Sequence, residues 1–71
     1  MVKALSNTLS VHRARLGLTQ AALAEQAFIT RKSVTAIETG NMVPSVVLAL
    51  KLAHALGVEV EEIFSLADDS A

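Results

Sequence analysis

The sequence predicts an all-α fold, with five helices in one compact domain. Gly17, Gly40 and Gly57 each follow a stretch of helical periodicity, as glycines that end helices commonly do. The pattern shows neither strand-like alternation of apolar residues nor internal repeats. The length of 71 residues fits a single domain, 1–71, with a core at about 6–66 and an acidic tail at 67–71.

Residues that commonly begin helices predict where the first and fourth helices start. Ser6 or Asn7, either of which can cap a helix, begins the first helix, which runs through TLSVHRARL. Pro44 and Ser45 precede the fourth helix, VVLALKLAHAL. A short fifth helix is expected over about Val60–Leu66.

The second and third helices form a helix-turn-helix unit. They are expected at about Gln20–Ala27 and Arg31–Thr39, each preceded by a threonine N-cap, with a turn of about three residues between them. In the third helix Val34 and Ile37 fall on one side, which predicts that they face the core. A different, exposed face is then predicted for Arg31, Lys32, Thr35 and Ala36.

Charge is divided unevenly along a chain whose net charge is only −1. Residues 1–57 contain all six cations and two acids, for a net charge of +4, whereas residues 58–71 contain five acids and no cation. This asymmetry indicates one surface for an anionic partner and an acidic end held away from it. Two independently solvated charge groups would give the same pattern, so charge alone leaves both interpretations open.

Two cations stand where local electrostatics disfavour them. Arg31 and Lys32 lie in the first turn of the third helix, where the helix dipole costs each about 0.3–1 kcal/mol. A helix that enters the major groove of DNA with its N-terminus first brings first-turn side chains to base edges and backbone amides to phosphate. DNA as an external anion therefore accounts for both cations.

Residues with catalytic or metal-binding chemistry are sparse. The chain has no cysteine for disulfides or thiolate metal sites, and His12 and His54 lie on separate helices without a partner at ligand spacing. No local pattern places a base beside a serine or threonine. We expect a non-enzyme without a metal or cofactor. The lack of a secretory signal and the polar residues within 42–58 predict a cytoplasmic protein without a membrane span.

The strongest signal is the segment LGLTQAALAEQAFITRKSVTAIETGNMVPSVVLALKLAHALGVEVEEIF. It resembles the Cro/phage-repressor-type helix-turn-helix family of small bacterial transcriptional regulators, and the resemblance covers residues 7–66. The motifs that carry it are GLTQ followed by LA, then TRKSVTAIETG, the PS pair and the final EEIF. The resemblance implies a transcriptional regulator that binds double-stranded DNA sequence-specifically through the major groove.

The resemblance also implies roles by position. Gln20, at the start of the second helix, would hydrogen-bond the DNA backbone. Arg31 and Lys32 would read bases, with Thr35 and Ala36 as further contacts one turn on. Phosphate contacts or helix caps are implied for Thr30, Ser33, Thr39 and Asn41. Because guanine is the natural partner of a bidentate arginine, we expect a G near the outer edge of each half-site.

Two residues depart from the family pattern. Phe28 stands at the turn position commonly held by glycine, where a positive φ strains a bulky residue by about 1–2 kcal/mol. Thr39 stands where asparagine is frequent. Glu38 is expected to form an intramolecular ion pair with Arg13 or Arg15.

The fourth helix is apolar almost all round, with mainly Lys51 and His54 as polar residues. Such a helix is buried on more than one side, and in so small a domain a second copy of the chain is the expected cover. The alternative cover is the N-terminal segment, residues 1–5. The dimer interface is expected to include Val47, Leu48, Leu50, Ile63, Phe64 and Leu66.

These features together predict a homodimeric repressor whose recognition helices, about 34–36 Å apart, read a near-palindromic operator. The alternative is a protein-interaction module, antitoxin-like or an adaptor, that uses the fourth and fifth helices and binds DNA only secondarily. Loss of function at Leu48, Leu50 or Phe64, with Arg31 and Lys32 dispensable, would favour that alternative. RNA is a weaker third partner because the aromatics that stack on single strands are missing.

Overall fold

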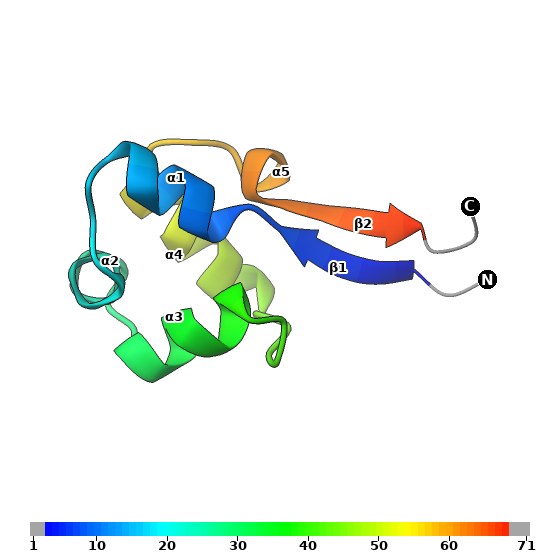
Figure 1. Cartoon of the computed structure of the whole chain (residues 1–71), viewed down its shortest axis with the longest axis horizontal. Coiled ribbons are helices and arrows are strands. Elements are labelled where there is room, and N and C mark those ends of the chain that lie inside the picture. The colour runs from blue at the N-terminus through cyan, green and yellow to red at the C-terminus, as the bar shows by residue number, and fades with distance from the viewer. Residues whose placement is uncertain (1–2, 69–71) are drawn as a thin grey trace.

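The computed structural model describes residues 3–68, which form five helices and one two-stranded sheet (Figure 1). The helices pack into one body, and the sheet extends from it as a ribbon. In chain order the elements are β1 (Lys3–Asn7), α1 (Leu9–Arg15), α2 (Gln20–Ala27), α3 (Arg31–Glu38), α4 (Val46–Leu56), α5 (Val60–Ile63) and β2 (Phe64–Asp68). The end of the acidic tail, residues 69–71, lies outside the described residues.

The ribbon corrects the prediction of an all-α fold. β1 and β2 pair antiparallel, with Leu5 opposite Leu66. The predicted fifth helix therefore shortens to the four residues of α5. A capping box between Glu59 and Glu62 starts this single turn, and the backbone becomes extended at Phe64, with φ −116° and ψ 136°. The strand begins there because β1 supplies backbone partners that a helix end lacks.

The first helix, α1, begins at Leu9, slightly later than predicted. Asn7 organises this start, because its Oδ1 accepts a hydrogen bond from the N–H of Leu9 at 3.1 Å. Its Nδ2 donates to the backbone oxygen of Ile37 at 3.0 Å. The N–H of Thr8 donates to the backbone oxygen of Ile63 at 2.8 Å. The described part of the N-terminal segment, residues 3–5, is thus the start of β1 and pairs with β2.

The predicted caps of α2, α3 and α4 are confirmed. The hydroxyls of Thr19, Thr30 and Ser45 each accept a hydrogen bond from a first-turn N–H, at 3.0 or 3.1 Å. Each cap satisfies a donor that has no partner within the helix and contributes about 1 kcal/mol. At its other end α4 is closed by Gly57, with φ 69°. The caps fix where α2 and α3 begin, and hence where their first-turn side chains lie.

Aliphatic side chains fill the core where the helices converge. Each of the five helices contributes at least one fully buried side chain: Leu9, Leu23, Val34, Ile37, Leu52 and Ile63. Small residues on the inner faces of α2 and α4 let these two helices approach closely: Ala24, Ala27, Ala49 and Ala53. The inward direction predicted for Val34 and Ile37 is confirmed. It turns the opposite side of α3 outward.

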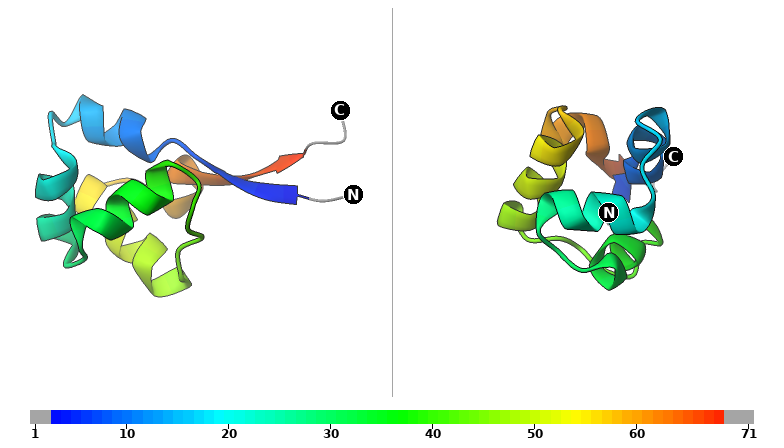
Figure 2. Two further views of the ribbon diagram at one scale, coloured as in Figure 1. Left: turned by 60° about the horizontal axis from the view of Figure 1, so that its bottom comes forward. Right: turned by 90° about the vertical axis from the view of Figure 1, so that its left-hand side faces the viewer.

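The ribbon points away from the helical body, and the α2–α3 turn lies at the opposite end of the molecule (Figures 1 and 2). The overall extents are 37 × 20 × 19 Å. Because Leu5 and Leu66 are directly opposite, their side chains share one face of the ribbon, and Ala4 and Ala67 share the other. Within residues 3–68, every helix is too short or too polar to cross a membrane.

Candidate nucleic-acid interface

The first turn of α3 is open to solvent. Thr30 closes the helix start, because its hydroxyl oxygen accepts from the N–H of Ser33 at 3.1 Å. The same hydroxyl donates to Oγ of Ser33 at 3.0 Å. Arg31 and Lys32 are exposed, as predicted, and their charges add to the positive end of the helix dipole. The N-terminal end of α3 therefore presents positive charge to solvent.

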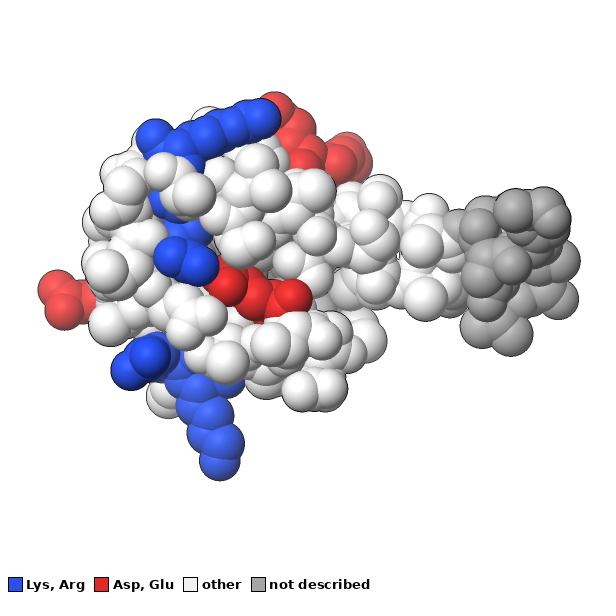
Figure 3. All heavy atoms as spheres, viewed as in Figure 1, with Lys and Arg blue, Asp and Glu red and all other residues white. Residues whose placement is uncertain are grey.

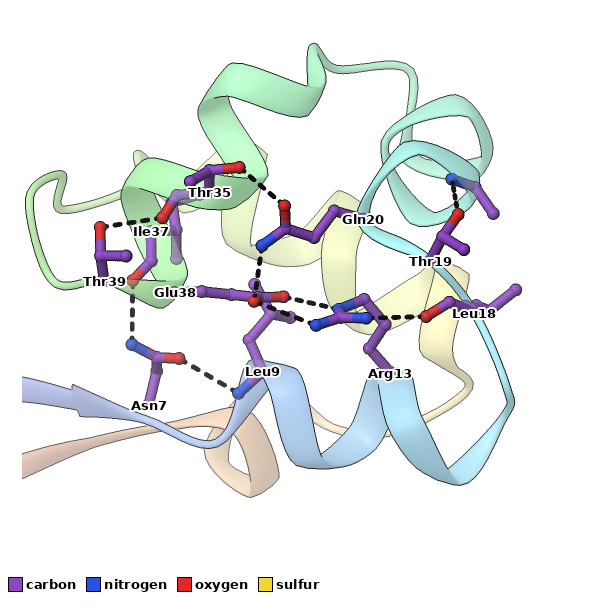
Figure 4. Close-up of polar contacts among 11 residues, drawn as sticks. Asn7, Leu9, Arg13, Leu18, Thr19, Gln20, Thr35, Ile37, Glu38 and Thr39 are labelled. Atoms are coloured by element: carbon purple, nitrogen blue, oxygen red, sulfur yellow. Dashed lines mark hydrogen bonds and ion pairs between the residues drawn. The ribbon is translucent and has the colours of Figure 1, made fainter.

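The second turn of α3 is less open than predicted. Thr35 and Ala36 are half-buried rather than exposed. The hydroxyl of Thr35 donates to Oε1 of Gln20 at 2.9 Å, which directs this side chain towards α2 (Figure 4). The backbone oxygen of Ala36 accepts from the N–H of Asn41 at 2.9 Å, which holds the following loop against the helix. The exposed side chains of α3 thus lie mainly in its first turn.

A chain of side-chain hydrogen bonds joins α1, α2 and α3 behind this surface (Figure 4). Glu38 accepts from Nε of Arg13 at 2.8 Å and from Nη2 at 3.3 Å, which confirms the predicted ion pair. Gln20 donates through Nε2 to Oε1 of Glu38 at 3.0 Å and accepts from Thr35. Arg13 also donates through Nη1 to the backbone oxygen of Leu18 at 2.9 Å. These hydrogen bonds hold Gln20, the first residue of α2, against α3.

The ion pair is shielded from water. The side chains of Arg13 and Glu38 are only 21% and 9% exposed. Burial raises the pKa of Glu38, but hydrogen bonds from Arg13 and Gln20, together with the Arg13 charge, outweigh it and hold that pKa below its ordinary value of 4.5. The hydrogen bond with Glu38 raises the pKa of Arg13. Both groups are therefore charged at neutral pH.

An open hollow of about 510 Å³ lies beside this network, lined by Arg13, Thr19, Gln20, Ala21 and Arg31. The Arg31 guanidinium and the positive end of the α2 dipole meet there beside the Arg13–Glu38 pair, so the local potential favours an anion. Figure 3 shows Lys and Arg side chains gathered over the end of the molecule that holds α1, α2 and α3.

The residues predicted to contact DNA divide between the two ends of α3. Its cap and first turn hold four of them: Thr30, Arg31, Lys32 and Ser33. Gln20 joins this group across the hollow. Thr39 and Asn41 follow the last turn and are exposed, and the hydroxyl of Thr39 donates to the backbone oxygen of Thr35 at 2.9 Å. The two groups lie at opposite ends of α3, whose eight residues span about 12 Å.

The residues predicted for a dimer interface divide by burial. Three are exposed: Val47, Leu50 and Leu66. Ile63 and Phe64 belong to the core of this chain, and Leu48 is half-buried and packs against it. Ile63 and Phe64 are 2% and 9% exposed, so they support the chain's own core. Val43 and Val46, which were not among the residues predicted for the interface, are also exposed.

Phe28 ends α2 at the turn between α2 and α3. This residue has φ 58° and ψ 43°, in the left-handed region. Its N–H donates to the backbone oxygen of Glu25 at 3.3 Å, and the N–H of Ile29 donates to that of Ala24 at 2.9 Å. Such paired bonds end a helix at a left-handed residue. The positive φ on which the predicted strain depends is therefore present at Phe28.

Two short helices joined by this turn, the second beginning with exposed cations, define a helix-turn-helix protein. Residues 9–63 match the helix-turn-helix family, and the chain belongs to its Cro/C1-type branch of transcriptional regulators. It is 49% identical over 61 residues to an uncharacterized HTH-type transcriptional regulator of Methanothermobacter thermautotrophicus, covering 84% of this chain and 88% of that protein. It is 39% identical over 66 residues to the regulator YgzD of Bacillus subtilis, covering 93% and 100%.

Solved structures show the same fold. The restriction-modification controller protein C.AhdI from Aeromonas hydrophila superposes with a TM-score of 0.74 at 39% identity, covering 76% of this chain and 82% of that one. The clp gene regulator ClgR from C. glutamicum gives a TM-score of 0.70 at 31% identity, covering 76% and 70%. The curated relatives are named as transcriptional regulators, not enzymes. Among the described residues, no group of three or more His, Cys, Asp or Glu could hold a metal.

Arg13 and Ala21 line the hollow, although the sequence did not single them out as DNA contacts. For Arg13 the available signal was its pairing with Glu38, which places it beside the third helix. Its position next to Gln20 depends on how α1 packs against α2, and no local pattern records that packing. Ala21 carries no chemical signal, and it borders the hollow only because it follows Gln20 in the first turn of α2.

Proposed function

We propose that the protein binds double-stranded DNA sequence-specifically, as a homodimeric repressor, with the first turn of α3 in the major groove. The observation that carries this proposal is the exposure of Arg31 and Lys32 at the start of α3, beside a cationic hollow. Arg31 and Lys32 reach base edges, and the hollow receives a phosphate. Membership of the Cro/C1-type family and the likeness to C.AhdI, a controller protein by name, support the proposal.

Gln20 is suited to the phosphate. Its side-chain NH₂ group has two protons, and one hydrogen bond to Glu38 uses one of them, so the second is free for a phosphate oxygen. Its Oε1 is held by Thr35. A side chain already fixed on both atoms loses little conformational entropy on binding. Gln20 therefore positions the duplex without reading its sequence.

A second copy of the chain covers the apolar surface around the start of α4. Four apolar side chains with exposed fractions between 55% and 76% follow one another there: Val43, Val46, Val47 and Leu50. Leu5 and Val43 line one groove of about 300 Å³ between the ribbon and the α3–α4 loop. Leu66 lies directly opposite Leu5 and continues the same surface.

The size of this surface fits a homodimer. Burying a valine or leucine side chain removes roughly 60–120 Å² from water, so six such side chains with exposed fractions between 37% and 76% offer roughly 220–450 Å². An interface at the lower end of the standard range, about 600 Å² per partner, that is about 65% apolar needs about 400 Å² of apolar surface. A twofold dimer then presents two α3 helices to half-sites about 10 bp apart.

Selection of bound sites from a random duplex library tests the proposal. The wild type is compared with Arg31→Ala/Lys32→Ala, and with Arg15→Ala/Lys51→Ala, which removes the same charge from α1 and α4. We expect the wild type and the charge-matched control to enrich one near-palindrome that the Arg31/Lys32 variant loses. Enrichment of nothing above the salt-sensitive background would overturn the proposal and favour the alternative, in which the apolar surface binds another protein.

A further inference from the structure

Phe28 stands where the backbone favours glycine. Among the described residues it is the only non-glycine with a positive φ, and the others are Gly17, Gly40 and Gly57. The turn itself needs only backbone groups, because the N–H groups of Phe28 and Ile29 make its hydrogen bonds. A glycine would form the same turn without strain. The turn therefore does not explain why position 28 is a phenylalanine, and the reason must lie in its side chain.

The ring of Phe28 takes no part in the core. It is 86% exposed, the largest exposed fraction among the large apolar side chains described, whereas the neighbouring Ile29 packs against the core. The other aromatic residue, Phe64, is a core residue. An exposed ring gains almost nothing from burial within the chain, so no internal contact offsets the backbone strain. The remaining partner is an apolar surface outside the chain.

The position of the turn identifies that surface. Within two residues the chain passes from Phe28 to Thr30, the cap of α3, and then to Arg31. The turn lies at the end of the molecule opposite the ribbon, whose Leu5 and Leu66 belong to the surface assigned to the second copy (Figures 1 and 2). A duplex that receives the first turn of α3 therefore lies next to Phe28.

We propose that Phe28 is an apolar DNA contact at the edge of each half-site, against a thymine 5-methyl group or a deoxyribose face. Phenylalanine is among the side chains that contact thymine methyl groups in the major groove. The proposal rests on the proposed function, because it requires α3 to enter the groove. It adds a contact that releases no counterion, unlike those of Arg31 and Lys32.

Phe28→Gly and Phe28→Asn separate the effect on folding from the effect on binding. Glycine and asparagine both adopt the left-handed conformation, so each variant is expected to melt about 2–8 °C higher than the wild type. Each is also expected to bind the selected operator about tenfold more weakly. A residue with a purely structural role would not combine higher stability with weaker binding. Val11→Ala, at an exposed apolar site on α1, is the matched control and leaves affinity unchanged.

Two further readouts identify the chemistry of the contact. The affinity lost in Phe28→Gly is expected to be the same at about 50 mM and about 200 mM salt, whereas Arg31→Ala/Lys32→Ala flattens the salt dependence. Replacing each operator thymine by uracil removes its 5-methyl group. A position where this weakens the wild type but not Phe28→Gly identifies a methyl contact, and the lack of such a position identifies a deoxyribose contact.

The outcomes distinguish this inference from the function on which it rests. If both Phe28 variants bind as tightly as the wild type while Arg31→Ala/Lys32→Ala loses the operator, the Phe28 contact is wrong and the regulator remains. If the variants bind more weakly but also melt at a lower temperature, Phe28 supports the fold, and the contact is again wrong. If the wild type selects no duplex at all, both proposals fail.

Discussion

Glu38→Gln tests whether the shielded ion pair holds the helix-turn-helix unit together. The substitution keeps the shape of the side chain but removes the charge that faces Arg13. Breaking a fully buried pair costs about 3–5 kcal/mol, and an exposed pair contributes about 0.2–1 kcal/mol. Because these two side chains are 9% and 21% exposed, we expect a loss of about 2 kcal/mol. For a domain of this size that lowers the melting temperature by about 8–16 °C.

Urea unfolding at one fixed protein concentration measures this loss, because the proposed dimer would make stability depend on protein concentration. The expected result is a lower midpoint with an unchanged slope. Arg13→Met in the Glu38→Gln background should recover part of the stability, since it removes the unpaired charge. A loss below about 0.5 kcal/mol, or full additivity of the two changes, would refute the assignment of the ion pair as a stabilising element.

The same pair predicts a dependence on pH. The pKa of Glu38 is lower in the folded chain than its ordinary value of 4.5, so the folded state binds this proton less tightly than the unfolded state. The stability that results is present above pH 4.5 and is lost as the pH falls through the folded pKa. The difference in stability between the wild type and Glu38→Gln should therefore shrink in acid. A constant difference down to about pH 2 would contradict the lowered pKa.

Three further substitutions probe the core, a helix end and the apolar surface. Leu52→Ala, at a fully buried site, should cost about 2–5 kcal/mol in urea unfolding, and a loss under about 1 kcal/mol would contradict the packing. Gly57→Ala meets open space but keeps φ at 69°, so it should cost about 1–2 kcal/mol, with Gly57→Asn closer to the wild type. Leu50→Asp should shift the sedimenting species to a monomer and weaken operator binding, whereas an unchanged dimer would exclude this surface as the interface.

The helix-turn-helix unit could be predicted because its signals are local. The caps at Thr19 and Thr30 act within one turn, and the spacing of Val34 and Ile37 alone sets which side of α3 faces the core. Glu38 pairs with Arg13 as expected, but the inclusion of Gln20 in the same network depends on the packing of α2 against α3. Local sequence patterns thus predicted the helices of the unit, but only part of the side-chain contacts between them.

The ribbon could not be predicted because its partners lie at the two ends of the chain. Five-residue strands show too little alternation to stand out, and Phe64 and Leu66 continue the apolar pattern of a short helix. An apolar residue also does not reveal whether its own chain or a second copy covers it. Ile63 and Phe64 were expected at a dimer interface for that reason, whereas they pack in the core.

The pairing of β1 with β2 also sets the order in which the molecule can be completed during synthesis. Residues 9–63, which form all five helices, leave the ribosome between the two strands. At about 5–20 residues per second, β1 waits roughly 3–11 s for its partner to be made. The helix-turn-helix unit can therefore assemble on the nascent chain, and the ribbon closes only after β2 has been made.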